Sequence, residues 1–281
     1  MKLFYILGGG LGHLTRVQKL ISMLNIDEDY LIFSTVWATK VFPSDKCIVI
    51  DPEDFQNKKS LFPFLLLQLK KYSISDLYLD TFPLGLFKEI NPGLIPNQCR
   101  LHYIARYLRW DIYYGGLKSL KINFDHTYII DFLDKKQFQF IEDNAQTIHH
   151  LKLYPTDYKI KKKTIEEKFY LINHSGPQQE IDALIDLLKK HETYKKIPLP
   201  IIINTPKLTL QNDSIKVIHQ YPAFSLFEQA KLIVTGCGYN SMLETIPYQE
   251  KHIFLPFKRR FDNQFERAKR RRNESRSCKY L

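Results

Sequence analysis

Short apolar runs alternate with amphipathic stretches along the first half of the chain. Runs with the length of a buried strand occur at 3–7, 30–33, 47–50, 76–79, 101–104 and 126–130. Between the first two, residues 14–24 have the apolar spacing of an amphipathic helix. Strands that alternate with helices are typical of parallel βαβ units, whose doubly buried strands form continuous apolar runs. This half is therefore predicted to form a parallel α/β sheet.

The same alternation restarts after a Lys-rich stretch at 157–168, which has the composition of a linker. Further strands are predicted at 169–172, 201–203, 215–218, 232–234 and 252–255. Helices are predicted at 178–190, 223–230, 240–246 and from 262 onwards. We therefore expect two successive α/β domains, at 1–155 and 166–281.

Composition agrees with a folded two-domain protein. The chain has 281 residues, of which 44% are hydrophobic, and this excludes the composition of a disordered protein. The apolar run at 61–69 contains Pro63 and Gln68 and is shorter than the ~20 residues that cross a bilayer, so we expect a core helix there. The run at 3–7 is too short for a signal peptide, and four cysteines without metal-ligand spacing fit a cytoplasmic protein.

The net charge of +11 is concentrated at the carboxyl end. Residues 258–281 contain ten Lys or Arg and three acids, so they carry +7 and leave only +4 for the rest. No nucleic-acid recognition motif accompanies this end, and we expect no nucleic-acid partner. The basic end leaves open a peripheral contact with an anionic membrane, at its inner face.

Three segments with candidate chemistry follow predicted strands, where glycine-rich turns and helix N-termini bind anions in α/β proteins. The first, GGGLGH at 8–13, does not fit a dinucleotide fingerprint, because His13 takes the place of the last glycine. A histidine at a helix start can serve as a general base, whereas the structural alternative is a tight turn. The second, NHSGP at 173–177, offers Ser175 either to a phosphate or as an ordinary N-cap. The third is TGCGYNSMLE at 235–244, followed by FDNQFERA at 261–268.

Together these segments resemble the nucleotide-sugar signature of GT-B glycosyltransferases. In that superfamily a Gly-Trp-Asn-Ser-x-x-Glu type sequence precedes a proline, here Pro256, and then Asp-Gln or Asp-Asn-Gln. The GGGLGH run is similar to a first-domain loop of UDP-glycosyltransferases and of the lipid-linked N-acetylglucosaminyltransferases of cell-wall synthesis. The resemblance implies an α/β fold of two Rossmann-like domains facing across a cleft, with the acceptor in the first domain and the nucleotide sugar in the second.

The resemblance also implies roles for individual residues. Asn240 and Ser241 would bind the diphosphate, Glu244 the ribose hydroxyls, and the 262–264 segment the donor sugar. The implied nucleotide-sugar residues are Gly10, Gly12, Ser175, Gly176, His219, Gly238, Asn240, Ser241, Glu244, Asp262, Asn263 and Gln264. One departure stands out, because many members place a histidine on the phosphate where this chain has Gly236. A second is the short chain beyond the last motif, where the family usually continues with a helix that folds onto the first domain.

Catalysis is expected from the first domain. In inverting members of the family a histidine of the first loop is the base, and here His13 would deprotonate an acceptor hydroxyl. Asp80 would orient His13 or the acceptor, and Arg106 would meet an anionic acceptor, although a helix cap and a surface ion pair explain these two residues equally well. We expect no metal and no cofactor beyond the UDP-sugar co-substrate, because helix N-termini would stabilise the leaving diphosphate.

The sequence thus predicts an inverting glycosyltransferase that moves a hexose from a UDP-sugar to an acceptor hydroxyl of unknown identity. Two alternatives stay open. A UDP-sugar 2-epimerase shares the architecture but needs further acid/base carboxylates, which the sequence does not identify. The other is a non-catalytic nucleotide-sugar-binding protein that has lost turnover with a truncated C-terminus.

Overall fold

The computed structural model describes residues 1–8, 11–27, 29–51, 58–115, 122–153, 167–206 and 215–277. It divides the chain into two compact units. Unit 1 comprises Met1–Tyr154 and the tripeptide Arg260–Asp262, and unit 2 comprises Pro155–Arg259 and Asn263–Leu281. The stretch expected as a linker, 157–168, lies almost entirely outside the described residues.

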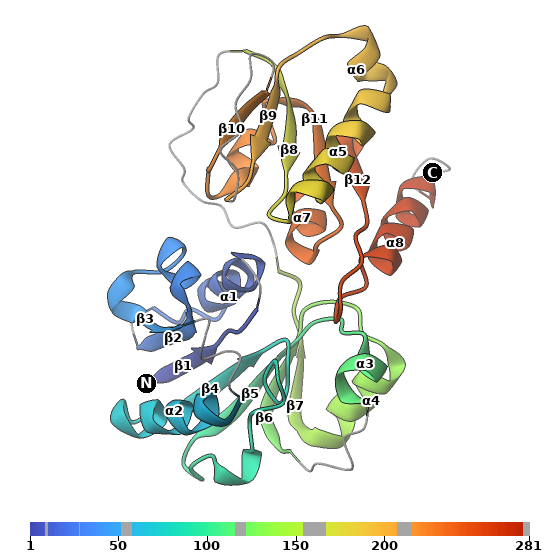
Figure 1. Ribbon diagram of the computed structural model, residues 1–281. Coiled ribbons are helices and arrows are strands. Elements are labelled where there is room, and N and C mark those ends of the chain that lie inside the picture. The colour runs from blue at the N-terminus through green and yellow to red at the C-terminus, as the bar shows by residue number, and fades with distance from the viewer. Residues whose placement is uncertain are drawn as a thin grey trace. The chain divides into compact units, whose positions relative to one another are not determined.

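Unit 1 is built on a 7-stranded sheet with the order β3-β2-β1-β4-β5-β6-β7, in which all described pairs are parallel (Figure 1). Its strands are β1 (Lys2–Tyr5), β2 (Tyr30–Thr35), β3 (Cys47–Ile50), β4 (Asp76–Asp80), β5 (Arg100–Ala105), β6 (Phe124–Ile129) and β7 (Ala145–His150). The chain runs outward from β1 to β3 and then returns to the other side of β1 with β4. Ligands of open parallel sheets bind at such a reversal, beyond the carboxyl ends of the strands.

The helices of unit 1 are α1 (Leu11–Met23), α2 (Lys58–Lys71), α3 (Trp110–Tyr114) and α4 (Lys135–Asn144), with short 3-10 helices at Val36–Lys40, Ser44–Lys46 and Pro92–Leu94. In α2, Leu61, Leu65 and Leu69 recur every fourth residue and therefore share one face, which is buried in the main core. The strands contribute alternate residues to that core, as Leu3 and Tyr5 of β1 do. The core helix predicted at 61–69 is therefore confirmed.

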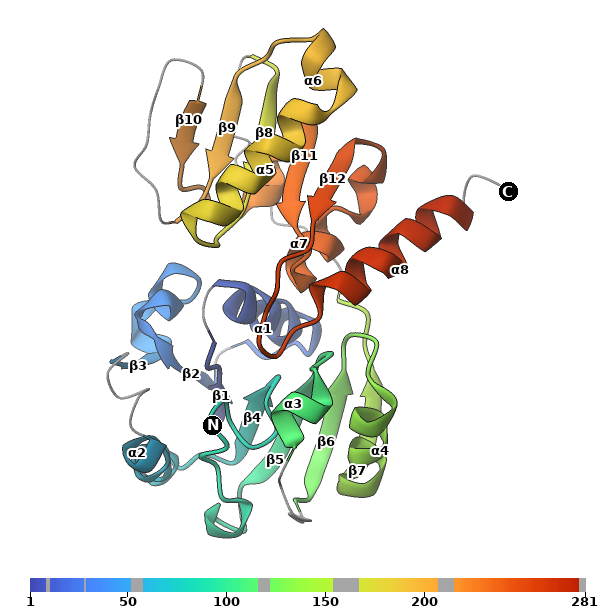
Figure 2. The ribbon, with the colours of Figure 1, turned by 45° about the vertical axis from the view of Figure 1, so that its right-hand side comes forward.

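Unit 2 contains a 5-stranded sheet with the order β10-β9-β8-β11-β12, again parallel in every described pair (Figure 2). The strands are β8 (Phe169–Asn173), β9 (Ile201–Asn204), β10 (Ile215–Ile218), β11 (Ala230–Gly236) and β12 (His252–Leu255). The helices are α5 (Gln178–Lys190), α6 (Glu192–Lys196), α7 (Tyr239–Glu244) and α8 (Gln264–Ser277), with 3-10 helices at Ala223–Leu226 and Ile246–Lys251. Successive strands run outward from β8 to β10, and the chain then returns to the other side of β8 with β11, as it returns to the other side of β1 with β4 in unit 1.

Helix α5 covers one face of this second sheet. Ile181, Leu184 and Leu188 pack with Tyr170 and Val234 of the strands, and a separate cluster covers the other face. Both faces of the sheet are therefore buried, which explains the continuous apolar runs that predicted its strands.

Two expectations about the elements need correction. The helix predicted at 223–230 is only a 3-10 helix over Ala223–Leu226, because Ala230 already belongs to β11, where it pairs with Phe169 of β8. Strand β7 was not predicted, because its sequence AQTIHH contains no apolar run. Among the described helices, none is long and apolar enough to span a bilayer.

Candidate active site

His13 and Asp80 meet at the strand reversal of unit 1. His13 lies in the first turn of α1, next to Gly12, and Asp80 is the last residue of β4. The Nδ1 atom of His13 lies 2.6 Å from Oδ2 of Asp80. The strand order brings these residues together across 67 positions of sequence, while Gly10 of the same loop lies outside the described residues.

Gly8 makes room for the imidazole of His13. A Cβ atom on Gly8 would lie 2.5 Å from both Cδ2 and Nε2 of that ring, closer than van der Waals contact allows. On another side the ring stacks on Phe82, with centroids 6.2 Å apart. The glycine after β1 is thus required by the close approach of a side chain to the backbone.

Arg16 shares the carboxylate with His13, which the sequence analysis missed. Its Nη2 atom donates to Oδ2 of Asp80 at 2.6 Å and to Oγ1 of Thr81 at 2.7 Å, and its Nε atom donates to Oδ1 at 3.0 Å. The side chains of Arg16 and Asp80 are 2% and 0% exposed, so the ion pair is dry. The sequence spacing could have indicated this, because Arg16 is three residues after His13 and therefore lies on the same side of the helix.

The two nitrogens of His13 have different surroundings. Nη2 of Arg16 also lies 3.0 Å from Nδ1 of His13, so the Nδ1 position is bounded by a donor and by a carboxylate acceptor. A proton on Nδ1 is held by Asp80 and leaves the Nε2 lone pair available. In the part of the chain that the structure describes, Nε2 of His13 has no hydrogen-bond partner.

Burial lowers the pKa of His13, the Asp80 carboxylate opposes this, and the Arg16 cation adds to the lowering. For Asp80, burial alone would raise the pKa, but the charges and hydrogen bonds of Arg16 and His13 hold it well below its usual range. At neutral pH the imidazole is therefore neutral and the carboxylate is charged. This is the protonation state that a general base requires.

The backbone beside this carboxylate is strained. Thr81 has φ of 67°, in the left-handed region that β-branched residues rarely adopt, and its side chain is fully buried. Its carbonyl oxygen accepts a hydrogen bond of 2.9 Å from the Tyr103 hydroxyl. Strain of this kind persists where the surroundings over-determine the conformation, and it is frequent at functional sites.

Arg106 and Asp262 form an ion pair within unit 1. Nη1 of Arg106 lies 2.9 Å from Oδ1 of Asp262, and both side chains are largely buried. The neighbouring Phe261 accepts a backbone hydrogen bond of 2.9 Å from Arg109 and packs edge-on against Phe82. The residue expected to meet an acceptor and the residue expected to bind the donor sugar therefore neutralise each other in this structure.

In unit 2, the motif at 235–244 runs from β11 into α7 as expected. Gly238 precedes the first turn of α7, and Asn240, Ser241 and Glu244 lie within that helix. Ser175 and Gly176 lie between β8 and α5. His219 follows β10, and its Nδ1 atom is hydrogen-bonded to the backbone oxygen of Thr205.

Asn263 and Gln264 have structural partners. The Oε1 atom of Gln264 accepts hydrogen bonds from the backbone N–H groups of Cys237 at 3.1 Å and Phe257 at 3.0 Å. It thus ties the end of β11 to the chain that leaves β12. The Oδ1 atom of Asn263 accepts from the backbone N–H of Glu266 at 3.1 Å, which caps α8.

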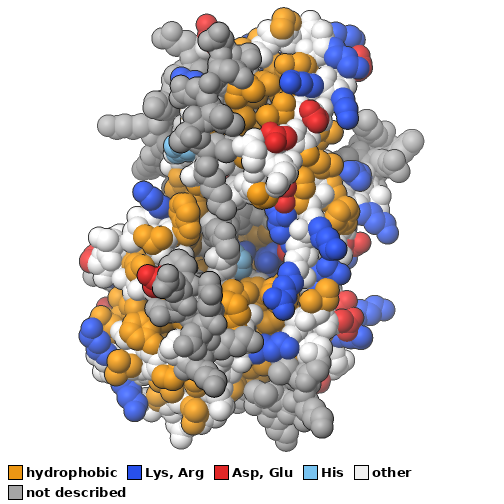
Figure 3. Space-filling view, in the orientation of Figure 1, with side chains coloured by type: hydrophobic (Ala, Val, Ile, Leu, Met, Phe, Trp, Pro, Cys, Tyr) orange, Lys and Arg blue, Asp and Glu red, His pale blue; other side chains and the backbone are white. Residues whose placement is uncertain are grey.

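The basic carboxyl end is partly structural. Arg267 and Arg271 of α8 are buried and donate to the backbone oxygens of Cys237 and Met242, at the two ends of the 237–242 stretch. By contrast, Lys269, Arg270 and Arg272 are exposed. On the face shown in Figure 3, Lys and Arg side chains are spread over both units.

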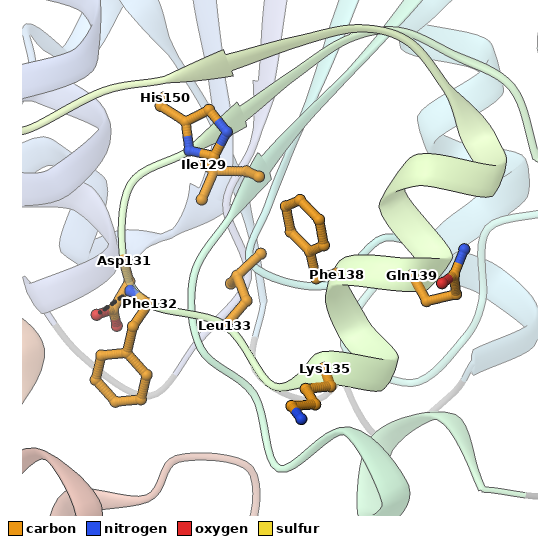
Figure 4. Close-up of a pocket in the computed structure, with 8 residues that line it drawn as sticks. All are labelled: Ile129, Asp131, Phe132, Leu133, Lys135, Phe138, Gln139 and His150. Atoms are coloured by element: carbon orange, nitrogen blue, oxygen red, sulfur yellow. Dashed lines mark hydrogen bonds between the residues drawn. The ribbon is translucent and has the colours of Figure 1, made fainter.

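Unit 1 also has a pocket of about 490 Å³ at the carboxyl ends of β6 and β7 (Figure 4). Leu133 and Phe138 lie at its centre, and Asp131, Lys135 and His150 lie on its rim. No residue that the sequence analysis selected lines this pocket.

No protein-family model matches the chain, and no curated protein sequence matches it. Solved structures do match. The crystal structure of the glycotransferase of kitacinnamycin is 10% identical with a TM-score of 0.62, over 97% of this chain and 83% of that one. Spinosyn rhamnosyltransferase SpnG is 12% identical with a TM-score of 0.57, over 91% of this chain and 81% of that one. The co-structure of S. aureus MnaA with UDP is 12% identical with a TM-score of 0.56, over 92% of this chain and 80% of that one.

At such low identity the likeness establishes the architecture, which agrees with the two parallel sheets and their reversals described above. The chain therefore has the GT-B fold of these glycosyltransferases, with two Rossmann-like α/β units.

Proposed function

We propose that this protein is an inverting, metal-independent glycosyltransferase that moves a hexose from a UDP-sugar to an acceptor hydroxyl. The observation that carries the proposal is the buried His13–Asp80–Arg16 arrangement at the strand reversal of unit 1. It supplies a neutral imidazole whose Nε2 atom has no partner among the described residues. A structure of SpnG with thymidine diphosphate and one of MnaA with UDP support a nucleoside diphosphate as the ligand.

In the proposed reaction the acceptor hydroxyl transfers its proton to Nε2 of His13 while its oxygen bonds to the anomeric carbon. The bond between that carbon and the diphosphate oxygen breaks in the same displacement, so the configuration inverts and UDP leaves. Asp80 holds the Nδ1 proton and stabilises the imidazolium that forms.

We assign the nucleotide to unit 2. The diphosphate is proposed to contact the loop of Ser175 and Gly176 and the segment of Gly238, Asn240 and Ser241. Glu244 is proposed to accept both ribose hydroxyls, and the backbone near His219 to hold the base. Because Arg106 and Asp262 are already paired, this ion pair has to open before either residue contacts an acceptor or a sugar.

The proposal is tested first by a thermal-shift screen of nucleotide sugars, because a ligand that binds only the folded state raises its apparent stability. UDP-sugars should stabilise the protein, and Glu244→Ala should weaken UDP binding measured by calorimetry. UDP should also bind more tightly than thymidine diphosphate, which lacks one ribose hydroxyl. An unchanged UDP affinity in Glu244→Ala would refute the ribose assignment.

Transfer is then measured as UDP release with a panel of hydroxyl acceptors and with EDTA present. His13→Ala should lower the rate by about 10²–10⁴-fold and leave donor binding near normal. Wild-type turnover in that variant would exclude His13 as the base. Interconversion of a UDP-sugar without any acceptor would identify an epimerase instead, and binding without any turnover would identify a nucleotide-sugar-binding protein.

A further inference from the structure

The strand reversal of unit 2 holds a histidine that the proposed function does not yet use. His174 directly follows β8, and Gly236 ends the neighbouring strand β11. A Cβ atom on Gly236 would lie 2.8 Å from Cε1 and 3.0 Å from Nδ1 of the His174 ring. The imidazole thus lies against the backbone at the end of β11, in the space that a side chain at position 236 would enter.

Within the described parts of the chain, one nitrogen of this imidazole has a hydrogen-bond partner. Nε2 of His174 lies 2.6 Å from Oε2 of Glu180, in the first turn of α5. Among the described residues, Nδ1 has no hydrogen-bond partner, although the side chain is only 9% exposed. The unpartnered nitrogen is the one that faces Gly236. This nitrogen is not among the buried unpartnered atoms, so it is accessible and can accept or donate a hydrogen bond to a ligand.

The surroundings hold the ring in place. The Phe257 ring packs against His174 with centroids 5.2 Å apart, and it would also lie 3.3 Å from a Cβ atom on Gly236. A Cβ atom on Gly176 would collide with Nε2 of His174 and with the Glu180 carboxylate. Two glycines and an aromatic ring therefore enclose the imidazole–carboxylate pair.

The charges around the ring favour an anion at Nδ1. Arg259 donates two hydrogen bonds to Glu180, at 2.5 and 2.6 Å, and therefore neutralises that carboxylate. Burial lowers the pKa of His174, Glu180 opposes this and Arg259 adds to it, so the imidazole is neutral when no ligand is present. An added proton would give the three side chains one net positive charge, next to the end of β11. An anion there stabilises the protonated imidazole.

We propose that Nδ1 of His174 donates a hydrogen bond to a phosphate oxygen of the nucleoside diphosphate, and that His174 takes up one proton when the diphosphate binds. The inference rests on the proposed role of unit 2 in nucleotide binding. It assigns to the loop after β8 the phosphate-binding imidazole, and it gives Gly236 the role of leaving room for that ring.

The first test compares UDP with uridine by calorimetry. His174→Ala should weaken UDP binding by about 10- to 100-fold, the value of one charge-assisted hydrogen bond, and leave uridine binding unchanged. His191→Ala is the matched control, because His191 lies in the same unit and caps α6, and it should bind UDP as the wild type does. Equal losses of UDP and uridine affinity in His174→Ala would indicate a structural role and overturn the inference.

The second test measures protons. Binding of UDP to the wild type, followed in buffers of different ionisation enthalpy, should take up close to one proton, and binding to His174→Ala should take up fewer. UDP affinity of the wild type should rise as the pH falls from about 8 to about 6. UDP itself titrates near the lower end of that range. The contribution of His174 is therefore the difference in pH dependence of UDP affinity between the wild type and His174→Ala. Identical proton uptake in both proteins would contradict the inference.

A double-mutant cycle tests the role of Gly236. Gly236→Ala should displace His174 and weaken UDP binding, whereas the same change in the His174→Ala background should have no further effect. Independent, additive losses would refute the coupling.

The proposed function and this inference fail in different ways. A wild type that binds neither UDP nor thymidine diphosphate would refute the proposed function itself. If the wild type binds UDP and His174→Ala binds it equally well, this inference alone is refuted.

Discussion

At the scale of single residues, one buried carboxylate, Asp80, binds both the Arg16 guanidinium and the neutral imidazole of His13. It accepts hydrogen bonds from Arg16 and from Nδ1 of His13, and its side chain is fully buried. Burial is the largest cause of the lowered pKa of His13, Asp80 raises this pKa, and Arg16 lowers it further. The same carboxylate can therefore orient the imidazole while the imidazole stays neutral.

Replacing Arg16 should therefore change the protonation of His13. In Arg16→Met we expect the pKa of His13 to rise, because the cation that lowers it is gone and Asp80 remains. The acid limb of the pH–rate profile should move to higher pH, and the loss of one partner of a buried ion pair should cost about 3–5 kcal/mol of stability. The imidazole resonance of His13, followed by NMR, measures the pKa directly.

Arg16→Lys is the control for this prediction. It keeps the positive charge but loses the planar fork that donates to both Asp80 oxygens. The pKa of His13 should rise less than in Arg16→Met. If His13 titrates at the same pH in all three proteins, Arg16 does not tune the base.

At the level of elements, both sheets use the same local construction. A histidine that follows one strand of each reversal lies against a glycine: His13 against Gly8 at the end of β1, and His174 against Gly236 at the end of β11. In both cases the imidazole also contacts a carboxylate. Gly8 and His13 belong to the same connection after β1, whereas His174 and Gly236 are brought together by the pairing of β8 with β11.

Helix α8 shows that residues of one charge have different roles on one element. Arg267 is buried and its Nη1 atom donates to the Cys237 backbone oxygen at 2.9 Å. Arg270 is exposed and pairs with Glu266 across one turn of the helix at 3.0 Å. The first contact supports the 237–244 segment, whereas exposed ion pairs contribute little.

Arg267→Met and Arg270→Met remove the same charge from the same helix, so they form a matched pair. We expect Arg267→Met to lose about 1.5–3 kcal/mol of stability and to weaken UDP binding, because a buried hydrogen bond from a charged group is lost. Arg270→Met should change the unfolding free energy by less than about 1 kcal/mol. Denaturant unfolding of both variants tests this, and equal losses would contradict the structural role of Arg267.

The whole molecule is expected to be sensitive to acid. Burial lowers the pKa of His13, His102, His174 and His252, and these residues lie in both units. For His252, burial and the nearby Arg271 lower the pKa from 6.5 to about 3. The unfolded chain binds a proton at these histidines at higher pH than the folded chain does, so stability is lost as the pH falls below about 6.5.

His252 alone should contribute about 2 kcal/mol to the loss of stability between pH 6.5 and pH 5, at 1.36 kcal/mol for each pH unit. We expect His252→Gln to reduce the pH dependence of unfolding by about this amount, since glutamine does not titrate. A wild-type pH dependence in His252→Gln would show that His252 does not contribute.

Much of this architecture was predictable from the sequence, because its causes are local. Apolar runs mark strands, so β3, β10 and β12 were predicted with the bounds they have, although each is an edge strand, and α5 also begins and ends where its pattern does. Glycines after strands marked the loops of both candidate sites. The edge strand β7 was not predicted, because four of its six residues are polar and it contains no apolar run.

The sequence by itself determined the α/β class, most strands and the loops that carry chemistry. Only the tertiary structure decided the strand order, and with it the partners: Asp80 for His13, Gly236 for His174, and unit 1 for the tripeptide Arg260–Asp262. The reason is physical. Periodicity reports which face of an element is buried, whereas the side chain that meets a strand end depends on which distant strand lies beside it.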